Sequence, residues 1–70
     1  MHTLADLKDG KLNGLTQLTI SEDLSEFPDE IFTLSETLEI LDLSHNRLSA
    51  LPDLSRLKKL KIAFFSFNLF

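Results

Sequence analysis

Residues 38–48 constrain the fold of this chain more than any other stretch. They read LEILDLSHNRL, with apolar residues and one asparagine at Leu38, Leu41, Leu43, Asn46 and Leu48. The same five positions recur further along the chain at Leu60, Ala63, Phe65, Asn68 and Phe70, with identical spacing. The first four positions also occur earlier, again with identical spacing, at Leu15, Leu18, Ile20 and Asp23. Three occurrences in one phase predict a structural unit that recurs along the chain.

The residue types within this unit predict a short strand followed by a turn. The alternation Leu41-Asp42-Leu43 predicts a short strand with leucines facing the interior, because successive side chains on a strand point to opposite faces. Asn46 falls where the chain leaves this strand, and its amide can donate to and accept from backbone groups that a bend leaves unpaired. Asn68 is expected to do the same one unit later. Asp23 can only accept, so the first turn is expected to be less well satisfied. Leu24 comes one residue too early for the pattern, so the first unit is interpreted as a deletion variant.

The connector after the first strand changes its apolar period from two residues to about 3.6. Phe27, Ile31 and Leu34 share one stripe, and Pro28 precedes two acidic residues that suit a helix N-terminus. A short helix is therefore predicted over this segment. The next connector, residues 51–57, is shorter and predicts a tighter turn or a 3₁₀ segment.

The N-terminal residues predict a cap over the first unit. Thr3 is a typical helix N-cap residue, and Gly10 is a typical helix stop. A short helix over residues 3–9 is expected between them, where it would shield the first strand.

These motifs resemble leucine-rich repeat proteins. Residues 46–52, NRLSALP, are similar to the intracellular class, whose repeats are slightly shorter than those of the extracellular class. Residues 4–10, 27–32 and 37–44 are similar to the N-terminal repeats of bacterial proteins that fuse leucine-rich repeats to a protein kinase domain. No glycine-rich phosphate loop or catalytic aspartate motif occurs in the chain, so kinase activity is not carried over to it.

The resemblance implies an α/β fold, a short leucine-rich repeat solenoid of about two and a half repeats. Its parallel strands would line the concave side, behind an N-terminal helical cap. One domain is expected over residues 1–70, divided into a cap, repeat 1, repeat 2 and a truncated repeat 3 at 1–14, 15–37, 38–59 and 60–70.

Composition narrows the expected setting and partners. The chain has no cysteine, which excludes the disulfide-capped repeats of secreted proteins. Charged residues interrupt every early apolar run, so neither a signal peptide nor a membrane span is predicted, and a cytoplasmic protein is expected. Seven basic and eleven acidic residues give a net charge of −4, which disfavours nucleic acid and anionic membranes as partners.

The non-leucine strand residues would form columns on the concave face. These columns are Gln17, Ile40, Ile62; Thr19, Asp42, Phe64; Ser21, Ser44, Ser66; and Glu22, His45, Phe67. They become more apolar toward the C-terminal side, which predicts a protein-binding surface there. Its expected residues are Ile40, Asp42, His45, Ile62, Phe64 and Phe67. In the competing interpretation, a following repeat or an oligomer contact covers the two phenylalanines.

Two other interpretations of the polar residues are weaker. His45 near Asp42 is compatible with a proton-transfer pair, or with a metal site that includes Glu22 and Asp23. A solvated histidine is the simpler interpretation, because no nucleophile, glycine-rich loop or second histidine lies within one repeat. No catalytic residue, metal ligand or cofactor is therefore predicted. The basic cluster, interpreted as a solvated face, comprises Arg56, Lys58, Lys59 and Lys61.

The predicted function is non-catalytic protein–protein interaction through the concave strand face. Two alternatives stay open: an N-terminal repeat fragment of a longer regulatory enzyme, such as a leucine-rich repeat protein kinase, and a structural or vestigial fragment without a partner. End-to-end self-association through an uncapped C-terminal side is also expected. Phe65 and Phe70 would lack a covering repeat there, and the last strand would leave a sheet edge unpaired.

Overall fold

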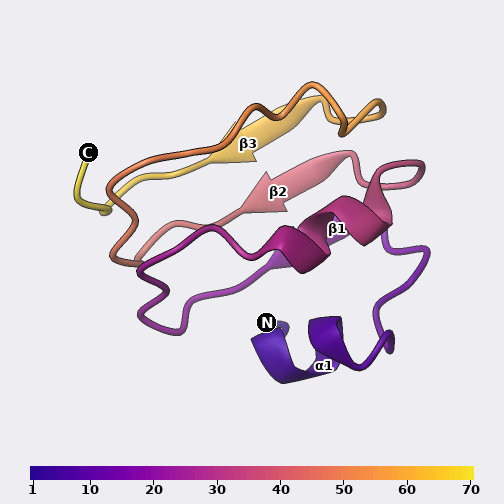
Figure 1. The fold of residues 1–70 in the computed structure, drawn as a ribbon, viewed down its shortest axis with the longest axis horizontal. Helices are drawn as coiled ribbons and strands as arrows, with labels where there is room; N and C mark the ends of the chain where they lie inside the picture. Colours follow the sequence, from indigo (N-terminus) through magenta and orange to yellow (C-terminus); the bar gives the residue numbers. More distant parts are fainter.

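Three short parallel strands form an open sheet in this α/β protein (Figure 1). A computed structural model describes all of residues 1–70. The strands β1 (Gln17–Thr19), β2 (Ile40–Asp42) and β3 (Ile62–Phe64) lie in chain order. Gln17 pairs with Ile40 and Ile40 with Ile62, which is the alignment that the recurring apolar pattern predicts. The predicted parallel sheet and the spacing of its short strands are confirmed.

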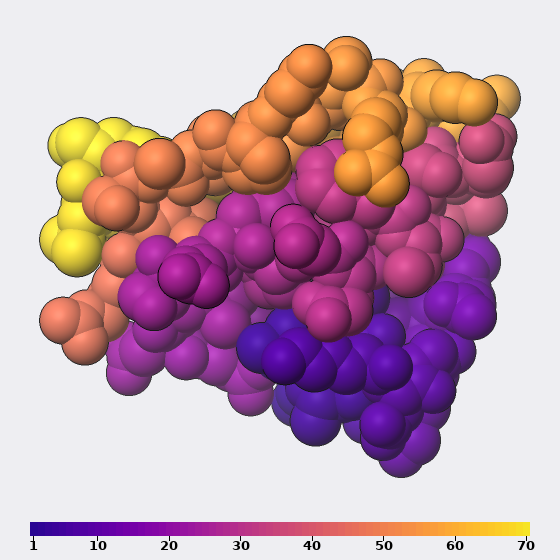
Figure 2. Space-filling view, viewed as in Figure 1, coloured from indigo at the N-terminus to yellow at the C-terminus, as the bar shows by residue number.

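The core lies between the sheet and the connecting segments. Its buried apolar residues are Leu7, Leu18, Ile20, Leu24, Ile31, Leu34, Leu38, Leu41, Leu43, Leu48 and Leu57. The inward positions around β3 are less well covered, since Ala63 and Phe65 are only half-buried and Phe70 is exposed. In Figure 2 the indigo N-terminal residues lie at the bottom of the molecule and the orange residues along its top, with the yellow C-terminal residues at the left.

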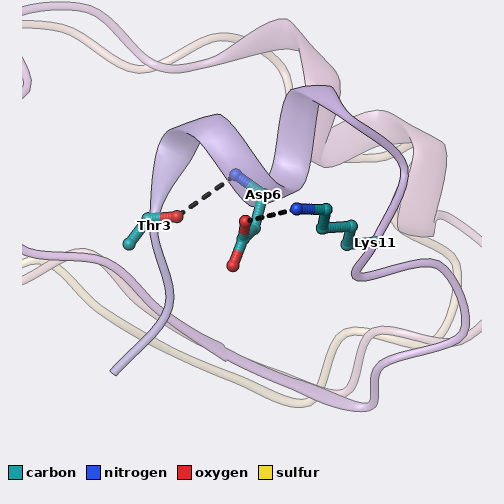
Figure 3. Close-up of polar contacts among 3 residues, drawn as sticks. All are labelled: Thr3, Asp6 and Lys11. Atoms are coloured by element: carbon teal, nitrogen blue, oxygen red, sulfur yellow. Dashed lines mark hydrogen bonds and ion pairs between the residues drawn. The ribbon is translucent and has the colours of Figure 1, made fainter.

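The N-terminal helix α1 (Leu4–Lys8) forms as the sequence predicts. Thr3 caps it by accepting a hydrogen bond from the backbone N–H of Asp6 at 3.1 Å, and Lys11 lies 3.7 Å from the Asp6 carboxylate (Figure 3). Gly10 follows the helix with a φ of 76°, a conformation that glycine adopts without strain.

His2 pairs with part of the free edge of β1, which the sequence did not reveal. Its backbone N–H donates to the Thr19 carbonyl at 2.7 Å, and its Nδ1 accepts from the Thr19 N–H at 3.0 Å. The N–H of Leu4 donates to Glu22 Oε1 at 2.7 Å and holds the start of the helix in place. The outward backbone groups of Thr19 are therefore already paired.

The connectors differ from each other, as the sequence predicts, but neither is α-helical. The first forms the 3₁₀ helix η1 (Asp29–Leu34), which buries Ile31 and Leu34. The second has only turns, and in it Ser55 donates its backbone N–H to Asp53 at 2.9 Å. This bond is the main reason that the pKa of the exposed Asp53 carboxyl lies below its usual value. No helix of the protein has the length and apolar character needed to cross a lipid bilayer.

The amide of Asn46 joins the turn after β2 to the turn after β1. Its Oδ1 accepts from the backbone N–H groups of Glu22 and Leu24, both at 3.0 Å. Its Nδ2 donates to the carbonyls of Ile20 at 2.9 Å and Leu43 at 2.8 Å. The side chain is buried, and the role predicted for it is confirmed.

Asn68 makes the corresponding bonds one interval later. Its Oδ1 accepts from the N–H of Leu48 at 2.9 Å, and its Nδ2 donates to the carbonyls of Leu43 and Phe65 at 3.0 and 2.9 Å. The two asparagines thus tie three successive turns together.

The first turn departs from the alignment expected from the sequence. Positive φ angles of 54°, 61° and 57° occur at Asp23, His45 and Phe67, so Asp23 takes the conformation of His45 and not the place of Asn46. The buried Leu24 nevertheless matches Leu48, because each donates its N–H to a turn asparagine. The turn after β1 is therefore one residue shorter, as a deletion variant requires.

Candidate functional site

Four of the six predicted binding residues lie together on the sheet. Ile40 is the register partner of Ile62, and Asp42 is the register partner of Phe64. Adjacent strands lie about 4.8 Å apart, so these side chains are neighbours on the face opposite the buried Leu41. Ile62 and Phe64 remain 49% and 47% exposed. We call Ile40, Asp42, Ile62 and Phe64 the strand-face patch.

The other two predicted residues stack on each other in the turns after β2 and β3. The rings of His45 and Phe67 have centroids 4.6 Å apart and planes only 11° from parallel. Both residues are exposed, and Phe67 is 74% exposed. The sequence placed them in one column but gave no ring orientation, so it did not predict this stack.

The backbone of Phe67 is strained. Its φ of 57° lies in the left-handed region, which is unusual for a bulky aromatic residue and costs about 1–3 kcal/mol. Aromatic stacking on His45 offsets only about 0.5–1.5 kcal/mol of this, and the exposed ring gains little from burial. A phenylalanine at this position is therefore not explained by the stability of the fold.

We expect Phe67→Asn to leave the free energy of unfolding unchanged or to raise it by up to about 1 kcal/mol, because asparagine tolerates the left-handed region. Phe65→Asn is the matched comparison, since Phe65 is half-buried and packs on the core. That change should cost about 3 kcal/mol. Urea denaturation followed by circular dichroism measures both. Equal losses for the two variants would show that the Phe67 ring is a structural element.

One carboxylate oxygen of Asp42 is used in a hydrogen bond within the turn that follows β2. Its Oδ1 accepts from the backbone N–H of Ser44 at 3.0 Å, which leaves the second carboxylate oxygen without a hydrogen bond in the structure. Asp42 is the register partner of the exposed Phe64, so this oxygen can accept a hydrogen bond at the margin of an apolar contact. Asp42 thus supplies a polar group next to an apolar surface.

The alternative of a metal or proton-transfer site gains no support from the geometry. No group of three or more His, Asp or Glu side chains is placed to hold a metal ion. The His45 ring stacks on Phe67 and makes no hydrogen bond to Asp42. The carboxylate of Glu22 accepts from the start of α1, so it is used in the N-terminal cap.

Two shallow depressions lie on another part of the surface, among the connecting segments. Their volumes are about 400 and 410 Å³. The first is lined mainly by residues 23–30, and the second by residues 25–27, 29 and 49–52. Neither includes a residue of the strand-face patch.

The basic cluster lies at the amino end of β3, beside acidic residues that precede β2. Lys58 pairs with Glu36 and Lys61 with Glu39, each at 3.3 Å. Arg56 lies over the ring of Phe32, 4.3 Å from its centroid. These contacts are on the surface, as a solvated cluster requires.

No protein-family model, curated protein or solved structure matches this chain.

Proposed function

We propose that this chain is a leucine-rich repeat module of about two and a half repeats that binds a protein partner without catalysis. The strand register supports the repeat assignment, because it aligns Gln17, Ile40 and Ile62 as the recurring sequence pattern does. The corresponding hydrogen bonds of Asn46 and Asn68 support it independently, because they recur at equivalent turns. The lack of cysteine fits a cytoplasmic setting.

The observation that carries the binding proposal is the exposure of Ile62 and Phe64 beside each other on the sheet. Apolar side chains packed on a regular strand face are held rigidly and lose little conformational entropy when a partner covers them. The partner inserts apolar side chains against Ile40, Ile62 and Phe64. Asp42 and His45, at the margin, orient it through hydrogen bonds.

Ile62→Glu is expected to weaken partner binding at least tenfold, because it replaces an exposed apolar side chain of the strand-face patch by a charged one. Ser49→Glu is the matched control: it adds the same charge at an exposed position outside the patch. Tagged versions of both are compared with the unchanged chain for the proteins that they capture. Circular dichroism should be the same for all three.

Direct contact is tested with a photo-crosslinking phenylalanine analogue at residue 64 and, for comparison, at the exposed Thr33 of η1. The captured partner should crosslink only from residue 64. Capture that survives Ile62→Glu, together with crosslinking from residue 33, would place binding on the connector side and overturn the assignment.

A further inference from the structure

The two edges of the sheet differ. At the β1 edge, His2 pairs with both backbone groups of Thr19. At the other edge, the N–H of Ile62 and the carbonyl of Phe64 both bond toward β2. Alternate residues of a parallel strand bond to opposite sides, so the N–H and C=O of Ala63 point outward, where no strand lies. We call this backbone the open edge.

The C-terminal residues do not cover the open edge. The N–H of Leu69 donates to the Leu48 carbonyl at 2.7 Å, and the ring of Phe70 meets Phe65 edge-on with centroids 6.4 Å apart. Both contacts turn the tail away from β3 after the strand ends, as the yellow segment of Figure 1 shows. Unpaired backbone groups therefore stay available beside exposed apolar side chains.

Charge is divided unevenly along the chain. Residues 1–46 contain ten acidic and two basic residues, a net charge of −8, whereas residues 47–70 contain one acidic and five basic residues, a net charge of +4. The strands follow chain order across the sheet, so the open edge belongs to the basic part of the molecule. An acidic partner is favoured there.

The pairing of β2 with β3 shows how acidic residues of one strand contact the lysines that precede β3. Glu36 and Glu39 of the β2 side lie against Lys58 and Lys61. The two lysine side chains are 69% and 70% exposed, so they can take a second acidic neighbour from the open side. A strand added in the same direction as β2 would bring its own acidic residues to these lysines.

We propose that the open edge of β3 binds an extended partner segment in parallel orientation, with acidic residues first and alternating apolar residues after them. Backbone bonds to Ala63 would hold the segment, and its side chains would extend the strand-face patch beside Ile62 and Phe64. This inference rests on the proposed function and specifies the chemistry of the partner.

A second copy of the chain is a poorer occupant. Head-to-tail pairing needs the β1 edge of the next copy, and His2 already occupies the Thr19 backbone there. Tail-to-tail pairing brings together two segments that each carry a charge of +4. The self-association expected from the sequence stays a prediction, and the experiment below separates it from partner binding.

The probe is a fluorescent peptide with the sequence of residues 36–46, ETLEILDLSHN. Within the chain, this segment contains β2, which pairs with β3 on the side opposite the open edge. Fluorescence anisotropy is measured with the full chain, and saturable binding is expected. Replacing the peptide's two glutamates by lysine should weaken binding at least tenfold, as should raising the salt concentration. Ala63→Pro should also weaken it at least tenfold, because proline suits an edge strand but lacks the N–H.

N-methylated peptides test the backbone bonds without altering the protein. In parallel register, the peptide positions equivalent to Ile40 and Asp42 bond toward β3, and that of Leu41 points away. Methylation at the first two should abolish binding, and methylation at the Leu41 position should leave it within about twofold. Equal effects at both kinds of position would overturn the proposal.

Two further results would also overturn it: no binding of the unmodified peptide up to about 1 mM, or a chain that sediments as a dimer which the peptide does not dissociate. The proposed function fails separately, through partner capture that is insensitive to Ile62→Glu. If the peptide binds the open edge but Ile62→Glu still captures the partner, the open-edge proposal holds and the assignment of the strand-face patch is wrong.

Discussion

Asn46→Ala is expected to lower the free energy of unfolding by about 2–4 kcal/mol. The change leaves the N–H groups of Glu22 and Leu24 and the carbonyl of Ile20 without a partner, whereas the Leu43 carbonyl keeps its hydrogen bond from Asn68. Each buried group left unpaired costs about 1–3 kcal/mol, and water can reach some of them. A domain of this length has a total stability of only about 4–10 kcal/mol, so much of it would be lost.

The control is Arg47→Ala, which removes an exposed neighbouring side chain and should change the stability by less than about 0.5 kcal/mol. Asn68→Ala provides a graded comparison, because Asn68 makes corresponding bonds but is only half-buried. The loss of unfolding free energy for Asn68→Ala should lie between the losses for Asn46→Ala and Arg47→Ala. Urea denaturation measures the series, and equal midpoints for Asn46→Ala and Arg47→Ala would show that the buried amide does not hold the turns together.

The sequence predicted those features that follow from the spacing of apolar residues and from the hydrogen-bonding capacity of particular side chains. The inward leucines set the positions and spacing of the strands, because a shift by a single position would expose Leu18 or Leu41. Asn46 and Asn68 were identified because a side-chain amide offers two N–H donors and a carbonyl acceptor at one site. These arguments depend on residue type and spacing alone, and both can be read from the chain.

Other features depend on contacts between distant segments, which spacing does not reveal. Pairing of His2 with Thr19 requires the N-terminus to lie along β1, and nothing in a lone histidine predicts that. The left-handed backbone at Asp23, His45 and Phe67 follows from the turn geometry, although only the first two of these residue types are enriched in that region. The type of helix η1 also differs from the expectation, because the periods of a 3₁₀ helix and an α-helix are indistinguishable over so short a segment.

His2→Pro is expected to lower the concentration at which the chain self-associates by at least tenfold. Proline removes both the N–H that pairs with the Thr19 carbonyl and the Nδ1 that accepts from the Thr19 N–H. Helix α1 should stay in place, since Leu7 is buried and the Leu4 N–H still meets Glu22. The acidic end of the molecule then presents an unpaired strand edge to the basic open edge of another copy.

Head-to-tail pairing of this kind does not close on itself, so open chains of molecules are expected instead of a defined dimer. Salt should reverse the association, because opposite net charges draw the two ends together. His2→Asn is the matched control: its backbone N–H is kept, and its side-chain oxygen can accept from Thr19. Sedimentation velocity over a concentration series decides the outcome. The same distribution of species for His2→Pro and His2→Asn would show that residue 2 does not protect the β1 edge, and that α1 or the turn at Glu22 keeps other copies away.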